Sequence, residues 1–365
     1  MSVSDGFSIS FSTKTFSIHD LKTNLQISNY EIYKQKALEF CVQWLEGKQS
    51  FVMNTSGSTG KPKSINIERK YLEKSALITA KALNLKKGDS ALVSLNIEYI
   101  AGMMMLVRGL EIGLKLTLTT PSGFPLNEFD ENTSFDFLSF VPLQIQNIIE
   151  KQPEKIKIIN KAKNIILGGA PISNDLEEKL QIFDAPIYHT YGMTETVSHI
   201  ALRRLNGKDK KKYFSTLKGV KIKLDDRGCL VIETPTAHEE VITNDLVEIK
   251  SEKDFIWLGR IDNVINTGGV KVQAEKIETQ IEIYFKKNNL NKRFFVAGLP
   301  DEKLGQIISL IVEGVEVKIN MEEINEIFLR NNFSKYETIK KIIFSENFIQ
   351  TPTGKIDKQK TIQHL

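Results

Sequence analysis

Between Phe51 and Ile67 the chain reads FVMNTSGSTGKPKSINI. Two short apolar segments, 51–53 and 64–67, flank a run of hydroxyl-bearing residues and glycines that ends in two lysines around a proline. Backbone N–H groups and hydroxyls of such a run can surround phosphate oxygens, and lysines supply counter-charge. The pattern predicts a strand, a nucleotide-phosphate loop and a second strand. The residues assigned to phosphate binding are Thr55, Ser56, Gly57, Ser58, Thr59, Gly60, Lys61 and Lys63.

Two other interpretations of this loop exist. Serine, threonine and glycine are common in turns that bind nothing. The other candidate is the Walker loop, which requires four residues between its first glycine and its Gly-Lys pair, followed by Ser or Thr. Only two residues separate Gly57 from Gly60, and Pro62 follows Lys61, so a Walker-type NTPase is disfavoured.

Composition narrows the class of protein. The chain has 365 residues, enough for two domains, with 41% hydrophobic and 26% charged residues, as in soluble globular proteins. A net charge of +4 gives no argument for nucleic acid. Two distant cysteines give neither a disulfide framework nor a metal spacing, which favours a reducing cytoplasm. Residues 1–20 do not resemble a signal peptide, and the apolar run 99–110 is too short to span a bilayer.

Strands and helices alternate through the first half of the chain, which predicts a layered α/β fold with a largely parallel sheet. From about Val197 short alternating strands predict a small antiparallel β subdomain, and the segment from Ile261 onward predicts a small α+β unit. The expected strands are 51–53, 64–67, 91–95, 115–119, 135–140, 164–167, 186–189, 200–203, 221–224, 230–233, 246–249, 294–297 and 307–312. The expected helices are 28–46, 68–83, 99–110, 143–151, 173–183, 276–285 and 321–330.

Two further glycine-containing segments follow predicted strands. They begin at Gly168-Gly169-Ala170 and at Tyr191-Gly192-Met193-Thr194-Glu195. Ligands of α/β proteins bind beyond the carboxyl ends of the strands, so these loops and the phosphate loop are expected to line one crevice. Tyr191 offers a flat face for a purine, and Glu195 is a hard oxygen ligand for Mg²⁺.

The C-terminal part contains two more motifs, Leu258 to Gly269 and Thr351 to Lys358. Gly268-Gly269 permits a turn that side chains would block. Taken alone, Lys355 is an ordinary exposed lysine of a terminal tail. In this order, however, the separated motifs resemble those of the adenylate-forming superfamily, which includes acyl- and aryl-CoA ligases. The resemblance runs from about Val52 to Lys358. It implies a large domain, 1–261, and a mobile lid domain, 262–365, with a hinge at Asp262.

The resemblance also implies roles for individual residues. The loop at Thr55 to Lys63 would hold the pyrophosphate end of ATP, and Lys355, Thr194 and Glu195 would act in catalysis, with Glu195 binding Mg²⁺. CoA would pass Gly268 and Gly269. The remaining residues expected to bind ATP are Gly168, Gly169, Ala170, Tyr191, Gly192, Met193, Asp245 and Arg260.

The implied reaction has two halves. A carboxylate attacks the α-phosphate of ATP and gives an acyl-adenylate and pyrophosphate. Because two anions must meet, the positive charge of Lys355 matters most in that step. The lid domain then rotates and CoA displaces AMP. The expected partners are therefore ATP, CoA and a small carboxylic acid, without nucleic acid, while the oligomeric state stays open.

The motifs are most similar to those of the o-succinylbenzoate–CoA ligase family of menaquinone synthesis. Tyr99, Arg108, Ser198 and His199 are the expected acid-binding residues. Arg108 is a lone cation on an apolar helix. It either snorkels to the surface or binds the second carboxylate of an aromatic diacid.

The chain departs from the family in several places. Only about 50 residues precede the phosphate loop, Tyr99 falls near a usual histidine, Asn244 replaces a glycine and Ala274 replaces a proline. Two alternatives stay open: a ligase for another acid or for a carrier-protein thiol, and a nucleotide-binding protein without catalysis.

Overall fold

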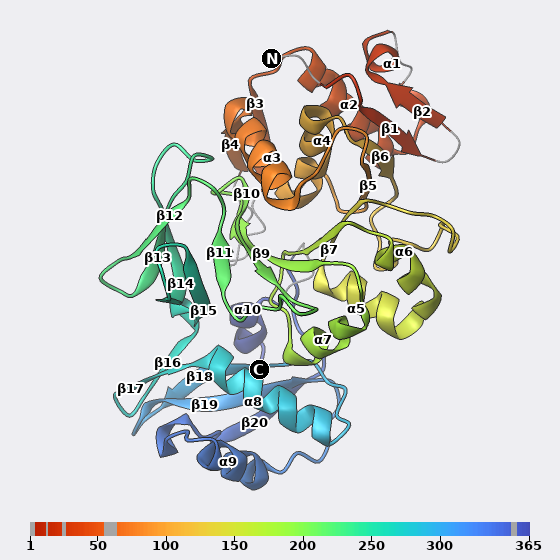
Figure 1. Ribbon diagram of the computed structural model, residues 1–365. Helices are drawn as coiled ribbons and strands as arrows, with labels where there is room; N and C mark the ends of the chain where they lie inside the picture. Colours follow the sequence, from red (N-terminus) through yellow and green to blue (C-terminus); the bar gives the residue numbers. More distant parts are fainter. Residues whose placement is uncertain (1–3, 12–13, 24–26, 55–63, 352–355) are drawn as a thin grey trace.

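A computed structural model describes residues 4–11, 14–23, 27–54, 64–351 and 356–365. Within these residues thirteen strands form one sheet in the order β12-β13-β14-β15-β11-β10-β9-β8-β7-β5-β6-β1-β2 (Figure 1). Six neighbouring strands of its centre, from β9 to β1, are parallel, as predicted. β3 and β4 form a separate antiparallel pair, and a five-stranded sheet made from the end of the chain contains β16 to β20.

Each predicted strand overlaps an observed one, whereas β1, β2, β11, β15, β16, β17 and β20 were not predicted. The strands are β1 Ser8–Phe11, β2 Lys14–Ser17, β3 Ser50–Asn54, β4 Ser64–Glu68, β5 Ser90–Val93, β6 Lys115–Leu118, β7 Phe137–Phe140, β8 Asn164–Leu167, β9 Ile187–Met193, β10 Ser198–Arg204, β11 Phe214–Thr216, β12 Lys221–Leu224, β13 Cys229–Glu233, β14 Val241–Ile249, β15 Asp254–Arg260, β16 Val264–Thr267, β17 Val270–Gln273, β18 Phe294–Asp301, β19 Gly305–Glu313 and β20 Lys341–Ser345.

The helices are α1 Ile18–Lys22, α2 Ile32–Leu45, α3 Arg69–Leu83, α4 Ile100–Ile112, α5 Pro142–Lys151, α6 Ile156–Asn160, α7 Asn174–Lys179, α8 Ala274–Lys287, α9 Met321–Arg330 and α10 Lys358–Gln363. Short 3₁₀ turns lie at Ile27–Asn29, Pro153–Lys155, Leu180–Ile182, Ile261–Asn263 and Lys335–Glu337.

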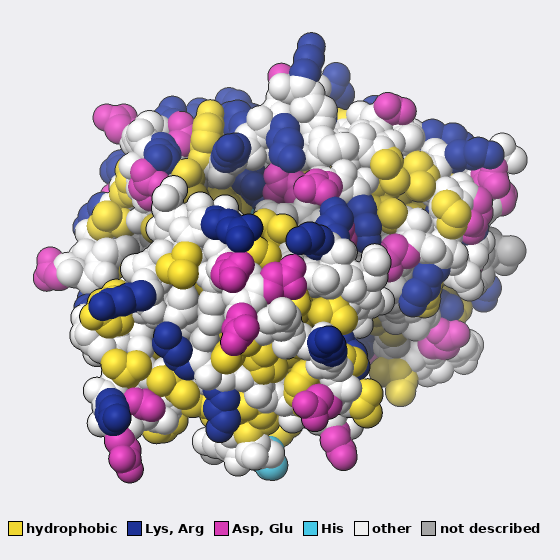
Figure 2. Space-filling view, turned by 90° about the horizontal axis from the view of Figure 1, so that it is seen from below, with side chains coloured by type: hydrophobic (Ala, Val, Ile, Leu, Met, Phe, Trp, Pro, Cys, Tyr) yellow, Lys and Arg dark blue, Asp and Glu magenta, His cyan; other side chains and the backbone are white. Residues whose placement is uncertain are grey.

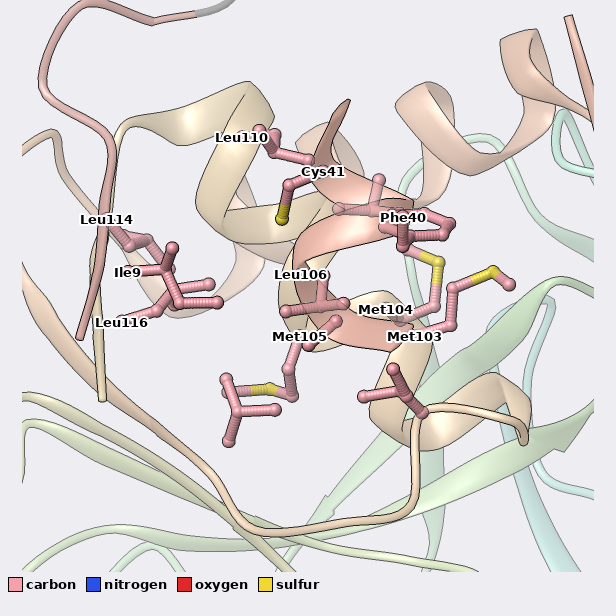
Figure 3. Close-up of a cluster of buried hydrophobic side chains, with 14 of the residues drawn as sticks. Ile9, Phe40, Cys41, Met103, Met104, Met105, Leu106, Leu110, Leu114 and Leu116 are labelled. Carbon is pink, nitrogen blue, oxygen red and sulfur yellow. The ribbon is translucent and has the colours of Figure 1, made fainter. Parts of the chain in front are cut away.

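Helices cover both faces of the parallel strands because successive side chains of a strand point in opposite directions. On β5, Ala91 and Val93 join the core beneath α2, α3 and α4, whereas Leu92 joins the core beneath α5, α6 and α7. Figure 3 shows the first core, in which Met103 to Leu106 of α4 meet Phe40 and Cys41 of α2. This packing explains why α4 is apolar almost throughout.

The antiparallel subdomain is confirmed, and it continues the main sheet. β10 pairs with β9, and β11 pairs with both β10 and β15. One expectation was wrong: Tyr191, Gly192 and Met193 are the end of β9 and do not lie in a loop after it. The strand continues because Gly192 lets the backbone at Ser198 approach; a Cβ there would stand 2.2 Å from the Ser198 carbonyl oxygen.

The C-terminal sheet lies beside the end of the main sheet, with α8 and α9 on it (Figure 1). Its core contains Ile277 and Ile281 of α8 and Phe328 of α9. Seen from below, this face of the molecule carries basic and acidic side chains in a mixed pattern (Figure 2). Among the described residues no helix has the length and apolarity needed to cross a membrane.

Candidate active site

The ladder between β14 and β15 positions a carboxylate opposite an arginine. Asp245 of β14 is the register partner of Arg260 of β15. Thr243, Asp245 and Val247 alternate along β14 and are all buried, as expected for one face of a strand. The backbone N–H of Asp245 donates to the Thr243 hydroxyl at 3.0 Å, so Thr243 supports the strand at the position of the carboxylate.

Three side chains surround the Asp245 carboxylate. The Tyr191 hydroxyl donates to Oδ2 at 2.7 Å, the Trp257 indole N–H donates to Oδ1 at 3.2 Å, and an Arg260 guanidinium nitrogen lies 3.7 Å from Oδ1. Burial, and then the Asp245 charge, raise the pKa of Tyr191, so the phenol stays a donor. A carboxylate has about four acceptor positions, so Asp245 retains capacity for hydroxyls of a ligand.

The ring of Tyr191 is held by two phenylalanines. Phe255 meets it edge-on with ring centroids 5.1 Å apart, and Phe214 lies at 5.7 Å. Such aromatic contacts fix a ring more tightly than burial alone. The sequence therefore identified Tyr191 and Asp245 but missed the residues that orient them, Thr243, Phe214, Phe255 and Trp257. Of these four residues, Thr243 could have been identified from the sequence, because it lies two positions before Asp245 and so on the same face of a strand.

The segment after β8 lies against β9. A Cβ at Gly168 would stand 2.3 Å from the Thr190 hydroxyl, and Gly169 has φ +85°, so both positions require glycine. Burial, and then the charge of Arg203, lower the pKa of His189 to about 3. The neutral imidazole donates from Nε2 to the Ala170 carbonyl at 3.3 Å. His189, which the motif analysis did not single out, thus ties this loop to β9.

The turn from Thr194 to Val197 joins β9 to β10 and carries backbone strain. Val197 and Ser198 have φ of +52° and +82°, a region that is costly for a β-branched residue. The buried Thr196 hydroxyl accepts the Met193 N–H at 3.0 Å and donates to the Ser198 carbonyl at 2.8 Å, and the Ser75 hydroxyl donates to the Val197 carbonyl at 2.7 Å. These bonds offset the backbone strain and hold the turn in place, and the turn thereby positions Ser198 and His199.

The catalytic residues predicted on this turn differ in exposure. Thr194 is buried. Glu195, two residues after the end of β9 at Met193, is exposed. Among the described residues Glu195 makes no hydrogen bond or ion pair with Asp245 or Arg260, although it follows the strand that carries Tyr191. The structure therefore links Tyr191, Asp245 and Arg260 directly and leaves Glu195 facing solvent.

Arg108 is the most unusual residue of the described chain. Its side chain is 1% exposed, so the expected alternative of a snorkelling arginine is wrong. One Nη donates to the Ser198 hydroxyl at 3.2 Å and the other approaches the Met105 sulfur at 3.8 Å, while buried Nε has no partner in the described structure. No carboxylate of these residues pairs with it, and burial lowers the pKa of Arg108 to about 9.

The other predicted acid-binding residues divide into two groups. Ser198 and His199 adjoin Arg108, and the His199 Nδ1 lies 3.5 Å from the Ser198 hydroxyl. Tyr99 instead occupies the N-cap position of α4, without a side-chain capping bond. Nine residues at 1.5 Å each separate it from Arg108 by roughly 14 Å along the helix axis. An acid that touched both would have to be elongated.

The predicted hinge is tied to the Asp245 cluster. Arg260 donates to Asp262 at 2.5 Å, and the Asn244 amide donates to the same carboxylate at 3.2 Å. Gly268 and Gly269 form the exposed turn between β16 and β17 with φ of +58° and +80°. They connect two strands of the C-terminal sheet, and within the described part of the chain no hydrogen bond or ion pair links them to the Asp245 cluster. Two predicted regions lie outside the described residues: the phosphate loop 55–63, between β3 and β4, and Lys355.

One shallow depression lies elsewhere, lined by Ser215, Thr216 and residues 251–254. It touches Asp254, the first residue of β15, whereas Arg260 is the last. Six steps of about 3.3 Å place the two ends roughly 20 Å apart. The depression is therefore separate from the predicted site.

Comparison with known families decides the class of this site. The family model described as "AMP-binding enzyme" matches residues 22–233, more than half of the chain. The chain belongs to the AMP-binding enzyme family. The resemblance to adenylate-forming enzymes that the motifs indicated is confirmed, and so are the mixed α/β fold and the enzyme class, an AMP-forming acid–CoA ligase.

Relatives of this AMP-binding enzyme differ in length. A 2-succinylbenzoate–CoA ligase of Listeria monocytogenes is 25% identical over 89% of this chain and 72% of its own. The corresponding enzyme of Lactococcus lactis is 26% identical over 85% and 70%. A solved acyl-CoA synthetase (AMP-forming)/AMP-acid ligase II-like protein of Dyadobacter fermentans is 41% identical, covers 93% of this chain and 97% of its own, and has a TM-score of 0.61.

A more distant solved structure shares the fold. The o-succinylbenzoate coenzyme A synthetase of Bacillus subtilis, in complex with ATP and magnesium ion, is 20% identical with a TM-score of 0.69. It covers 85% of this chain and 69% of its own. At this identity the likeness shows the architecture and leaves the substrate open.

Proposed function

We propose that this AMP-binding enzyme is an o-succinylbenzoate–CoA ligase, which activates its acid with ATP and transfers it to CoA in menaquinone synthesis. The names of relatives from several bacteria support this choice. The observation that carries it is the buried guanidinium of Arg108, which has no carboxylate partner among the described residues.

An unpaired buried cation is expensive unless an anion joins it. Arg108 lies on α4, and its contact residue Ser198 begins β10 directly after the strained turn that carries Thr194 and Glu195. A diacid could therefore place one carboxylate on Arg108 and present the other near that turn. Guanidinium–carboxylate pairs are among the strongest charge-assisted hydrogen bonds, so a monoacid would forgo a large part of the binding energy.

ATP would occupy the edge formed by β8, β9 and β14. The Thr55 to Lys63 loop would hold its phosphates, Tyr191 and the Gly168-Gly169-Ala170 loop would border adenine, and Asp245 would accept ribose hydroxyls. Arg260, 3.7 Å from Asp245, would lie beside the ribose and phosphates. Gly192 and Met193 would shape the backbone next to them.

A magnesium ion fits the donor set of this edge. Mg²⁺ commonly takes one or two carboxylates and completes its shell with phosphate oxygens and water. Glu195 supplies an exposed carboxylate on the turn after β9, and the described residues contain no cluster of three or more ligands for a purely protein-bound metal. The ion would neutralise phosphate charge. Thr194 would bond the α-phosphate and hold its orientation during attack.

We assign residues 1–261 to the ATP- and acid-binding domain and 262–365 to a lid that rotates about Asp262. In one orientation Lys355 would approach the acid carboxylate and α-phosphate; in the other, Gly268 and Gly269 would admit CoA. The bonds of Asp262 to Asn244 and Arg260 would have to open during this rotation.

The test is a pyrophosphate-release assay over o-succinylbenzoate, benzoate, phenylacetate, malonate and fatty acids, each with and without CoA. We expect o-succinylbenzoate to give the largest kcat/KM and a CoA thioester. Equal turnover of benzoate would overturn the diacid assignment. Pyrophosphate release with a thioester formed only on an added carrier protein would favour the alternative acceptor, and no release with any acid would favour a protein without catalysis.

A second test addresses the lid. Lys355→Ala should abolish adenylate formation and spare thioester formation from supplied acyl-adenylate, because only the first half-reaction brings two anions together. Rapid quench of each half-reaction measures this. An equal loss in both halves would contradict the assigned role of Lys355.

A further inference from the structure

We propose that Thr79 is a positioning residue for the acid site: it holds His199 in one tautomer, which directs the Ser198 hydroxyl so that its lone pair faces Arg108. This inference rests on the proposed function, since it concerns the same acid-binding guanidinium. Thr79 lies on α3 and is fully buried, and neither the sequence motifs nor the family match singled it out.

The direction of each hydrogen bond follows from counting protons. The Thr79 hydroxyl has one proton, and it is donated to the Ser75 carbonyl one turn earlier, at 3.0 Å. The His199 Nε2 lies 3.1 Å from the same oxygen. We assign the Thr79 proton to the Ser75 carbonyl, a group that can only accept, so the Thr79 oxygen accepts here and Nε2 carries the imidazole proton.

The other end of the ring is then an acceptor. His199 Nδ1 faces the Ser198 hydroxyl at 3.5 Å, so Ser198 can donate its proton to Nδ1 and accept the N–H of Arg108 at 3.2 Å. In the opposite tautomer, Nδ1–H and the guanidinium would both point at the Ser198 oxygen. The Ser198 proton would then have no acceptor, because Arg108 and His199 are its polar partners in the described structure.

Burial agrees with this assignment. His199 is buried, and desolvation followed by the charge of Arg108 holds its pKa well below the usual range, so the ring stays neutral. The site then has a single positive charge, and the donors that are still uncommitted, Nε–H among them, belong to the guanidinium. Such a site selects for one anionic group on the acid.

The first experiment uses the unmodified enzyme labelled with ¹⁵N-histidine. The His199 resonances, assigned with His199→Asn, should show a protonated Nε2 and an unprotonated Nδ1. A protonated Nδ1 would overturn the proposal. This measurement does not depend on whether any Thr79 variant folds.

The second experiment compares Thr79→Val with Thr79→Ser. We expect Thr79→Val to raise KM for o-succinylbenzoate about fivefold, the effect of one neutral hydrogen bond, with KM for ATP unchanged. Its His199 spectrum should become a mixture of tautomers, and Thr79→Ser should restore both. The matched control is Thr279→Val, because Thr279 makes the same bond to a carbonyl one turn earlier, at 2.9 Å to Glu275 on α8.

The outcomes separate the two proposals. If Arg108→Ala leaves KM for the acid unchanged, the acid site itself is wrong. If Arg108→Ala raises that KM but Thr79→Val leaves it unchanged, the acid site stands and the role of Thr79 is overturned.

Discussion

The two buried polar clusters of this AMP-binding enzyme differ in how their charges are balanced. Around Asp245 the protein supplies every partner: a phenol, an indole and a guanidinium lie within 3.7 Å of the carboxylate. Around Arg108 it supplies a hydroxyl and a thioether, and no carboxylate of the described residues reaches the guanidinium. One cluster is electrically complete without a ligand, and the other is not.

This difference indicates what each cluster can bind. A carboxylate that is already paired can still accept hydrogen bonds, which suits neutral hydroxyls such as those of ribose. A buried cation without a partner gains most from an anion, which suits a carboxylate. The two clusters should also respond in opposite ways when their charge is removed. Removal of an unpaired buried charge should raise the stability of the fold, whereas removal of a paired charge leaves its partners unsatisfied and should lower it.

The largest effect is expected from Arg108→Met. This change should raise KM for the acid about 100-fold, as for loss of a charge-assisted pair, and leave KM for ATP unchanged. In the ligand-free protein it should stabilise the fold by about 2 kcal/mol, because an unpaired charge leaves the core. Steady-state kinetics and urea unfolding measure both effects.

The matched control for this change is Arg203→Met. Arg203 is also mostly buried, but it pairs with Glu177 at 2.8 Å, so its loss should lower stability. A lower stability of both variants would show that Arg108 is balanced by the protein, and the contrast between the clusters would disappear.

The opposite sign is expected for Asp245→Ala. This change leaves the Tyr191 hydroxyl and the Trp257 N–H without their acceptor, which should lower stability by about 2 kcal/mol. KM for ATP should rise at least tenfold because the ribose loses its acceptor. Thermal unfolding and ATP kinetics test this, and an Asp245→Ala variant as stable as the parent would remove one side of the comparison.

A smaller effect is expected for Tyr191→Phe, which deletes one hydrogen bond and keeps the ring between Phe214 and Phe255. Stability should fall by about 1 kcal/mol and KM for ATP should rise by less than in Asp245→Ala. The acid KM should not move. If Tyr191→Phe equals Asp245→Ala, the phenol rather than the carboxylate holds the nucleotide.

The last prediction concerns pH, because His199 is buried beside Arg108 and the partly buried His189 lies on the strand that carries Tyr191. The pKa of His199 is well below the usual 6.5, and that of His189 is lowered to about 3. The unfolded chain takes up protons below about pH 6.5 that the folded chain does not, so stability falls as pH drops through 6.5, by up to about 1.4 kcal/mol per unit for each ring.

Urea unfolding at pH 7.5 and 5.5 checks this expectation. His199→Asn and His189→Asn should each reduce the loss of stability between the two pH values. His238→Gln, at an exposed position, is the control and should not. An unchanged slope in His199→Asn would show that this ring is protonated in the folded protein.

Much of the architecture could be predicted because it depends on local patterns. Short apolar segments that alternate with helix-periodic segments correctly predicted the parallel strands β5 to β8. Helix α9 was predicted with the boundaries that it has. The expected strands 221–224 and 230–233 form the antiparallel pair β12 and β13, because a short turn fixes its two strands as neighbours. The extension of β9 through Met193 was missed, since it depends on the close approach of Gly192 to Ser198.

The sequence by itself determined the family, the order of its motifs and the identity of Tyr191, Asp245 and Arg108 as candidates. Only the tertiary structure decided which of these charges are paired. Asp245 meets Arg260 and Trp257 on the neighbouring strand β15, but it meets Tyr191 across 54 residues of chain, and Arg108 meets Ser198 across 90. The free energy of a charge depends on what surrounds it, and those surroundings come from parts of the chain that no local pattern connects.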